Sequence, residues 1–412
     1  MNYSSLAVLC GVALVLCLVV PASCTMTPLW MEAGFKSGEL SGVVISADGS
    51  TILVGGDQVI SLTPEGRKRW AGWSANSLAV SSHGDYILAS NGQNVRLISG
   101  AGDLIWDKTT GITVTDISMT PDASVIAAAG GGRVITMTFS GENIGSNSTL
   151  AVNHIRLMPA GDRIIITTNN NLLVSNLTLI PEPLDTNTAQ NLIALAPDGS
   201  SFVTAAANHV RMYNRTGNLI WDKKVGEGNA EALAYSRDGS VIVIGTDDHR
   251  LVVLNRLGTS LWSATAENWV TCVAVSDDGS VIAAGSMDKK LYVYNRAGTL
   301  LGTFASQSAI TFNSVAVMGD GSLIIVADQT AVYAFPRSSF MPEETLKETT
   351  DVPLPETTTP LSTATTTRKA TSRIPTVPTP YPTEPENTEA PLPPAVPLAA
   401  LLLLFLFRLG KT

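Results

Sequence analysis

The sequence has few cysteines, few charged residues and no basic excess. Four Cys in 412 residues are too few for a disulfide scaffold. Charged residues make up 15% of the chain, against about 25% in an ordinary soluble domain. There are 26 Lys and Arg against 35 Asp and Glu, a formal net charge of −9. A nucleic-acid-binding protein needs a basic face to neutralise phosphates, so we expect no nucleic-acid partner.

Recognisable catalytic motifs are also lacking. The chain contains no Gly-x-Ser-x-Gly elbow, phosphate-binding loop or HExxH motif. A zinc or iron site needs three or four convergent ligands, whereas the four histidines are scattered. We therefore predict no catalytic residue, no metal and no cofactor, and interpret the histidines mainly as exposed turn residues: His83, His154, His209 and His249.

The N-terminus resembles a secretory signal peptide. An apolar run from Leu6 to Val20 precedes the small residues of Pro21 to Cys24, the usual layout of such a signal. We assign residues 1–24 to it, with an uncleaved anchor helix or a lipoprotein acceptor at Cys24 as alternatives. Cys272 falls within an apolar β pattern, which indicates a buried and unreactive thiol.

The C-terminal part has two segments of unusual composition. Residues 341–389 contain 15 Thr and 9 Pro, which predicts a disordered, extended stalk of the kind that carries O-linked sugars. Residues 390–412 contain an apolar run followed by Arg408 and Lys411. This pattern is typical of a membrane anchor with a cytoplasmic stop, although the run is shorter than the roughly 20 residues of a full span. A processed sorting signal remains an alternative.

The middle of the chain, residues 25–340, consists of eight copies of one sequence repeat. A turn pair recurs at intervals of 35 to 42 residues, and each copy contains four short apolar runs separated by turn residues. Four antiparallel strands in about 40 residues make a β-propeller blade. The turn pairs begin at Asp48, His83, Asp122, Ala160, Asp198, Asp238, Asp278 and Asp320.

The tryptophans predict how the ring closes. Trp70, Trp106, Trp221 and Trp262 each end a fourth strand, and the last repeat stops after its third strand, residues 331–335. We expect the segment around Trp30 to pair with the strand near Val332 and complete that blade, which leaves no free sheet edge. The fold class is thus all-β, an eight-bladed propeller with a blade shared between the two ends. A seven-bladed ring is the alternative.

The chain resembles the PQQ-like and WD40/YVTN-type β-propellers, especially surface proteins of methanogenic archaea. The resemblance rests on the V-A-V-S-x-D-G segment at 273–279, with similar segments at 43–49 and 315–321, and on NRTGNLIW at 214–221. It covers about residues 29–336 and implies architecture more than activity. The chain lacks the Gly-His signature of true WD40 repeats, and its Trp-Asp pairs (106–107 and 221–222) lie at the fourth strand. It also lacks the adjacent cysteines of quinoprotein dehydrogenases.

Candidate binding residues lie on the face formed by the second-to-third strand turns and by the connectors between blades. The longest connector in the sequence, 181–190, is our preferred locus, and two tryptophans outside the repeated position are candidate exposed anchors. Three Asn-x-Ser/Thr sequons are candidate glycosylation sites. We interpret the carboxylates on this face, Glu231 among them, as an acidic rim. The candidates are Pro181, Glu182, Asp185, Asn187 and Gln190 in the connector, Trp73 and Trp269 as anchors, and Asn147, Asn176 and Asn214 in the sequons.

These features together predict a non-enzymatic binding or scaffolding module of the cell envelope. We expect an extracellular propeller anchored to the cytoplasmic membrane, with a protein or glycan of the envelope as its partner. Two alternatives stay open. One is a propeller enzyme, either a quinone-dependent oxidoreductase or a metal-dependent lyase or lactonase. The other is a structural envelope component that assembles with itself.

Overall fold

A computed structural model describes residues 24–36, 40–148, 151–168, 171–179, 181–186 and 192–341, with only the backbone for 24 and 181–186. All of these residues belong to one compact unit, Met1–Asp351. Nearly all of the predicted signal peptide, stalk and anchor falls outside the described residues. Within them, no helix is long and apolar enough to cross a membrane.

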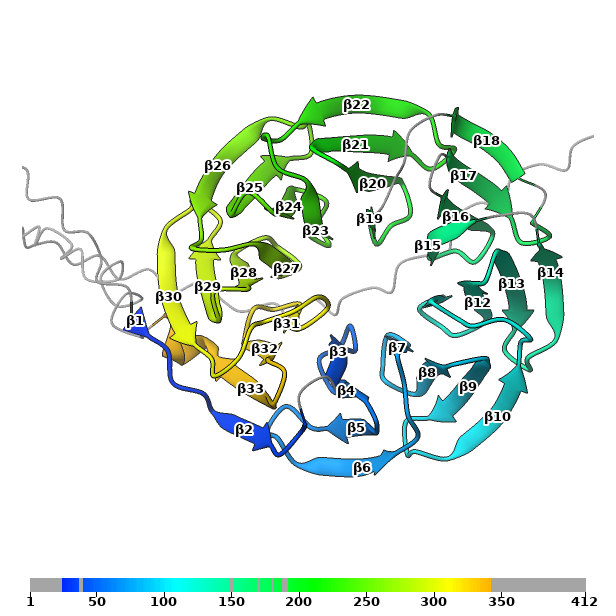
Figure 1. Cartoon of the computed structure of the whole chain (residues 1–412), viewed down its shortest axis with the longest axis horizontal. Helices are drawn as coiled ribbons and strands as arrows, with labels where there is room; N and C mark the ends of the chain where they lie inside the picture. Colours follow the sequence, from blue (N-terminus) through cyan, green and yellow to red (C-terminus); the bar gives the residue numbers. More distant parts are fainter. Residues whose placement is uncertain are drawn as a thin grey trace, which may run out of the picture. The chain divides into compact units, whose positions relative to one another are not determined.

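Eight sheets of antiparallel strands surround a central channel (Figure 1). In each blade the innermost strand is A and the outermost is D. Blades 1 and 2 consist of β3 (Leu40–Ile45), β4 (Ile52–Gly56), β5 (Val59–Leu62) and β6 (Lys68–Gly72), then β7 (Ser77–Val80), β8 (Tyr86–Asn91), β9 (Asn94–Ser99) and β10 (Leu104–Thr109). Blades 3 and 4 consist of β11 (Asp116–Met119), β12 (Val125–Gly130), β13 (Arg133–Thr138) and β14 (Asn143–Asn147), then β15 (Val152–Leu157), β16 (Arg163–Thr168), β17 (Asn171–Asn176) and β18 (Pro181–Thr186).

The second half of the ring repeats this order. Blades 5 and 6 consist of β19 (Leu192–Leu195), β20 (Ser201–Ala206), β21 (His209–Asn214) and β22 (Leu219–Lys224), then β23 (Ala230–Tyr235), β24 (Val241–Thr246), β25 (Arg250–Asn255) and β26 (Ser260–Thr265). Blade 7 consists of β27 (Val270–Val275), β28 (Val281–Ser286), β29 (Lys290–Asn295) and β30 (Leu300–Ala305). Blade 8 contains β31 (Val315–Val317), β32 (Leu323–Ala327) and β33 (Ala331–Pro336), which the short 3-10 helix η1 (Arg337–Ser339) follows.

Blade 8 is completed by β2 (Trp30–Ala33) from the N-terminal end of the described chain. β2 pairs antiparallel with β33, with Trp30 opposite Ala334 and Glu32 opposite Val332. The predicted closure is therefore confirmed, and the ring has eight blades rather than seven. Two chain segments about 300 residues apart must meet before the last blade is complete, so closure depends on long-range contacts.

The predicted A–B hairpins form in every blade. The eight turns all contain one residue with positive φ: Gly49, Gly84, Ala123, Gly161, Gly199, Gly239, Gly279 and Gly321. In blade 7 the carboxylate of Asp278 accepts hydrogen bonds from the Ser276 hydroxyl (2.8 Å) and from the Ser280 backbone N–H (2.9 Å). Burial opposes ionisation of this carboxyl, but these hydrogen bonds leave its pKa below the ordinary value. Turn geometry thus accounts for the repeated Asp-Gly pairs.

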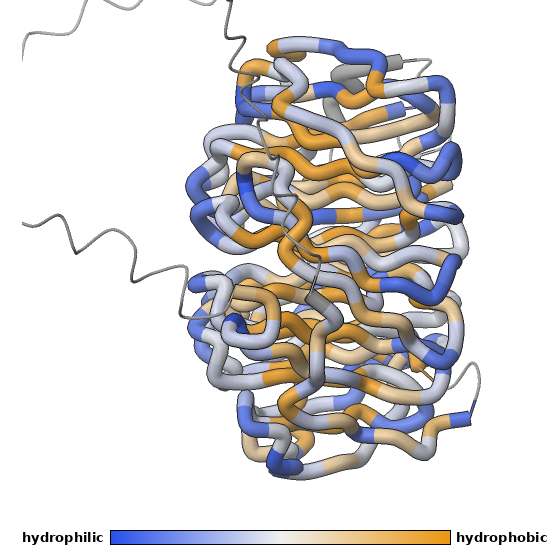
Figure 2. The backbone as a smooth tube through the Cα atoms, turned by 90° about the vertical axis from the view of Figure 1, so that its left-hand side faces the viewer, coloured by the Kyte–Doolittle hydropathy of each residue, from blue (hydrophilic) through white to orange (hydrophobic). Residues whose placement is uncertain are grey.

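Each blade is apolar on both faces because it lies between two others. Along β28, Val281 and Ala283 pack in one cluster with Ile324 of blade 8, whereas the intervening Ile282 packs with Val243 of blade 6. Figure 2 shows the result, with hydrophobic segments through the thickness of the ring and hydrophilic turns at its two faces. The second strands therefore read as continuous apolar runs, as expected for strands that are covered on both sides.

Tryptophans link five of the eight blades to the blade that follows. The sequence suggested that four of these tryptophans end strand D, but all four lie inside it, and Trp30 begins it. The indole N–H of each donates to a carbonyl in the C–D turn of the following blade. The side chain also lies over the glycine of that turn: a Cβ on Gly298 would be 2.7 Å from the Trp262 ring. The bonds run from Trp30 to Pro64 (2.8 Å), Trp70 to Gly100 (2.9 Å), Trp106 to Phe139 (2.8 Å), Trp221 to Arg256 (3.0 Å) and Trp262 to Arg296 (2.9 Å).

Between blades 7 and 8 a different contact replaces this tryptophan. Gly302 stands at the corresponding place of β30, opposite Val293. The short strand β1 (Cys24–Thr25) pairs in parallel with β30, with Cys24 opposite Gly302. The next residue, Met26, is buried in the seam together with Phe340. Both ends of the described chain therefore stabilise the junction between blades 7 and 8.

The Trp262 contact predicts a measurable loss of stability. Substitution Trp262→Phe keeps most of the ring area but removes the N–H that donates to Arg296. We expect the free energy of unfolding to fall by about 1 kcal/mol, the usual net value of one such bond. Thermal or urea unfolding of the full chain measures this. Trp269→Phe is the matched control, because Trp269 makes no such bond among the described residues. An equal loss in both variants would contradict the proposed role of the contact.

Candidate binding surface and central channel

The two faces of the ring carry different kinds of loop. The A–B and C–D turns form one face, here called the hairpin face. The B–C turns and the D–A connectors form the other, here called the connector face, and backbone hydrogen bonds join them: Met287 N–H donates to Trp269 O at 3.0 Å, and Val225 N–H donates to Asn208 O at 2.9 Å. The connectors are therefore held at the rim of the channel.

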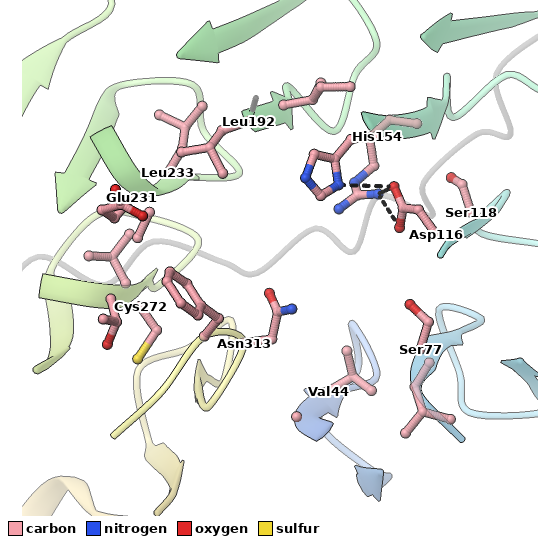
Figure 3. A pocket seen from close by; sticks show the side chains of 18 of the residues that line it. Val44, Ser77, Asp116, Ser118, His154, Leu192, Glu231, Leu233, Cys272 and Asn313 are labelled. Carbon is pink, nitrogen blue, oxygen red and sulfur yellow. Dashed lines mark hydrogen bonds and ion pairs between the residues drawn. The ribbon is translucent and has the colours of Figure 1, made fainter. Parts of the chain in front are cut away.

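The channel encloses a cavity of about 1320 Å³ lined mainly by the A strands. Its wall is largely apolar or hydroxyl-bearing on blades 1, 2, 7 and 8, where Val44, Ser77 and Val273 are examples. The acidic and basic side chains of the lining come from blades 3 to 6: Asp116, His154, Arg156, His209, Arg211 and Glu231. Figure 3 shows Asp116 and His154 on one wall and Glu231 on another. Only some positions of each A strand face the channel, because alternate side chains of a strand point to opposite sides. A charged side chain of an A strand therefore lines the cavity only where it stands at one of these positions.

Asp116 is buried and joins blades 3 and 4 through a hydrogen-bond network whose other side chains, His154 and Arg156, are partly exposed. Its carboxylate accepts bonds from the Arg156 guanidinium (3.0 Å) and from the Ile155 backbone N–H (2.9 Å), and it lies 3.3 Å from Nδ1 of His154. Burial would raise the pKa of Asp116, but the charge of Arg156 and the bonds from His154 and Ile155 outweigh it. The pKa of this carboxyl is therefore lowered, and the network holds a charge inside the wall.

Glu231 differs from Asp116 because its carboxylate has no hydrogen bond or ion pair within the described part of the chain. It lies on β23 at a β-bulge, where the register with β24 shifts between Ala230 and Ala232. Burial, and then the negative charge of Asp247, raise the pKa of Glu231. The protein itself thus leaves this acid uncompensated at the channel wall.

The structure separates the two candidate tryptophans. The Trp73 ring lies on blade 2, with the Arg96 guanidinium 5.6 Å from its centroid and its N–H 3.5 Å from Gly102 O. Trp269 is 45% exposed, and its indole has no partner among the described residues. Trp73 is 37% exposed, but its ring and its N–H both contact blade 2, so Trp269 is the better candidate for an interaction anchor.

The predicted connector 181–190 is largely a strand. Pro181–Thr186 form β18, the outermost strand of blade 4, which pairs with β17. The expectation of a long loop was wrong because an edge strand tolerates proline where its N–H would point outward, so Pro181 and Pro183 did not exclude a strand. Glu182 and Asp185 lie in this strand, and Asn187 and Gln190 lie outside the described residues. A binding role for the segment stays a prediction.

The three sequons are not equivalent. Asn176 and Asn214 lie at C–D turns, as expected, and the Oδ1 atom of each accepts the hydroxyl of the Thr two residues later at 2.8 Å. Asn147 lies in β14, and its side-chain nitrogen donates to Leu179 O in blade 4 (3.1 Å). A sugar on Asn147 would have to break this contact, so the geometry favours Asn176 and Asn214.

The histidines and Cys272 complete the inventory of reactive groups. His154 and His209 are paired with aspartates rather than free turn residues, with His209 Nδ1 at 2.6 Å from Asp222. Cys272 is buried, as expected, and burial raises the pKa of its thiol to about 12. Within the described ranges, no three His, Cys, Asp or Glu side chains converge as a metal site would require.

The Asp116 network was not predicted from the sequence. A signal was present, because charged residues stand in A strands where the other repeats have small or hydroxyl-bearing ones: Asp116 in blade 3, and His154 and Arg156 in blade 4. The alignment of repeats cannot show that these two blades are linked side by side through the same carboxylate.

The buried carboxylate predicts a pH-dependent contribution to stability. We expect Asp116→Asn to lower the free energy of unfolding by about 2 kcal/mol at neutral pH, as for a charged hydrogen bond. The pKa of Asp116 is lower in the folded chain than in the unfolded chain. The carboxylate therefore contributes its full stabilisation at pH values above its unfolded-state pKa, and this stabilisation is lost as the pH falls through its folded-state pKa. The gap between wild type and variant should therefore narrow in acid. Urea unfolding at several pH values measures it, and Asp103→Asn, at an exposed turn, is the control. A gap that is constant with pH would contradict this.

Comparison with known proteins supports the architecture. Residues 258–295 match the WD40 family model, described as WD domain, G-beta repeat. No curated protein matches the chain. Among solved structures, the crystal structure of the C-terminal WD40 domain of Sif2 is similar, with a TM-score of 0.66 and 13% identity over 76% of this chain and 99% of that one. At this identity the likeness concerns the fold alone. The chain is an eight-bladed β-propeller with a WD40-type repeat at the junction of blades 6 and 7, which confirms the resemblance expected from its sequence.

Proposed function

We propose that this propeller is a protein-binding scaffold that presents its connector face to a partner outside the cell. The observation that carries the proposal is an exposed apolar patch at the channel mouth. It consists of Trp269, Met287 and Phe312, which are 45%, 39% and 50% exposed. Large apolar side chains grouped on a surface are typical of interaction sites.

The three side chains of the patch come from three neighbouring loops. Met287 N–H donates to Trp269 O, and Ile310 N–H donates to Ser286 O at 3.3 Å, so the loops that carry the three side chains lie side by side. Phe312 also lines the channel cavity. A partner that covers the patch would thus reach the channel mouth as well.

The route of the chain supports presentation of this face. β33 ends at the hairpin face, where Arg337 N–H donates to Ser322 O in the A–B turn of blade 8. If residues 390–412 anchor the chain to the membrane, the attachment begins from the hairpin face. The connector face would then carry no attachment and would be open to a partner, and Asn176 and Asn214 would carry sugars at the C–D turns.

A site-specific cross-linker tests the binding function. With p-benzoyl-phenylalanine at position 269 of the full chain in the producing cells, we expect irradiation to yield one dominant adduct with a second protein. The same cross-linker at Leu257, 75% exposed on a C–D turn of the hairpin face, is the matched control and should give none. Adducts from position 257 alone, or none from position 269, would sink the proposal.

The surface location is tested separately. A membrane-impermeant amine reagent applied to intact cells should label the full chain to the same extent as in a lysate, because its exposed lysines would face the medium. A cytoplasmic protein of the same cells is the control and should be labelled only after lysis. Labelling of this chain only after lysis would show that the propeller is not displayed.

A further inference from the structure

Glu231 occupies a position that has a structural role in other blades. Strand A carries the same β-bulge in blades 1 and 7, where the extra residues are Ser41 and Thr271. The Ser41 hydroxyl donates to Ala75 O at 2.8 Å, and the Thr271 hydroxyl donates to Ile310 O at 2.6 Å. Each bond ties a blade to the connector of the next one. An ionised carboxylate has no proton to donate, so Glu231 cannot form this link.

The position of Glu231 relates it to the apolar patch. Val270 follows Trp269 in the chain and packs closely against Gly245 of blade 6, where an added Cβ would lie 2.6 Å from Val270 O. Gly245 is paired with Ala232, the residue after Glu231. Glu231 and Phe312 both line the channel cavity. The carboxylate and the patch therefore lie on neighbouring blades at one channel mouth, so one ligand can contact both.

The charge around the patch is negative. The loops of blades 6 and 7 on the connector face, 224–231, 247–250, 266–269 and 287–290, carry six carboxylates and four basic side chains. Two of the basic groups are already paired, Lys224 with Glu227 and Lys290 with Glu267. Among the described residues, the carboxylate of Asp247 accepts hydrogen bonds only from Asn229, which is neutral. The uncompensated charge is thus concentrated at Glu231 and Asp247.

We propose that the connector face of blades 6 to 8 binds a protein segment in which Lys or Arg stands next to a large apolar residue. The inference rests on the proposed binding function and adds the chemistry of the partner. The apolar residue covers Trp269, Met287 and Phe312, and the cation pairs with Glu231. Burial of the apolar contact excludes water from the ion pair, which strengthens it, and the aromatic rings accept a cation at close range.

A random dodecapeptide phage library panned on the immobilised full chain tests this chemistry. We expect enriched peptides to share a basic residue beside Leu, Phe, Trp or Met. Synthetic copies are then measured by fluorescence anisotropy. Glu231→Gln should weaken binding about tenfold and Trp269→Ser at least as much. Glu142→Gln, on an exposed turn of the hairpin face, should leave the affinity within twofold. Thermal unfolding confirms that each variant is folded.

The outcomes separate the two proposals. Peptides that bind without a basic residue, or that bind Glu231→Gln as well as the wild type, overturn the assignment of the cation while the protein-binding function stands. Failure to enrich any peptide above an unrelated immobilised protein overturns the short-segment inference. The binding function itself is judged by the cross-link from position 269, which does not depend on the chemistry of the partner.

Discussion

The structure depends on one constraint: each blade is a sheet with two apolar faces, and both must be covered. A four-stranded sheet of this kind is unstable alone, because strands such as β28 send alternate side chains into two different cores. Neighbouring blades provide the cover, so a linear row would leave two exposed faces at its ends. The ring removes them, and β2 removes the last free edge by pairing with β33. Closure is therefore a condition of stability for every blade.

The same constraint divides the molecule into an invariant and a variable part. At five of the eight junctions the tryptophan of strand D and the glycine of the following C–D turn hold adjacent blades together at the periphery, and the A–B hairpins repeat in all eight blades. The connector face contains fewer side chains that hold adjacent blades together. Charged and aromatic residues such as Glu231, Trp269 and Phe312 can stand there without loss of the ring, since no inter-blade core depends on them. Asp116 is intermediate, because it lies in the channel wall and also links two blades.

Most of the fold could be predicted because its determinants are local and repeated. The Asp-Gly turns and the period near 40 residues predict blades, and the unpaired third strand at 331–335 predicts the partner at Trp30. Prediction failed where one blade departs from the pattern. Residues 181–186 contain two prolines and were interpreted as a loop, yet they form the edge strand β18. An edge strand needs only part of its N–H groups, which composition does not reveal.

The sequence by itself determined the four-stranded repeat, the way in which the ring closes and the turns that build it, because these follow from short motifs that recur along the chain. The structure decided between the eight and the seven blades that the sequence left open. Only the tertiary structure decided which side chains meet. It joined Asp116 to Arg156 across a blade boundary, placed Trp73 on blade 2, left Trp269 exposed and set Glu231 at a bulge without a partner among the described residues. Contacts between blades link residues about 40 positions apart, and their side chains are oriented by the register and bulges of each strand. Those orientations are fixed only when the neighbouring blade is in place.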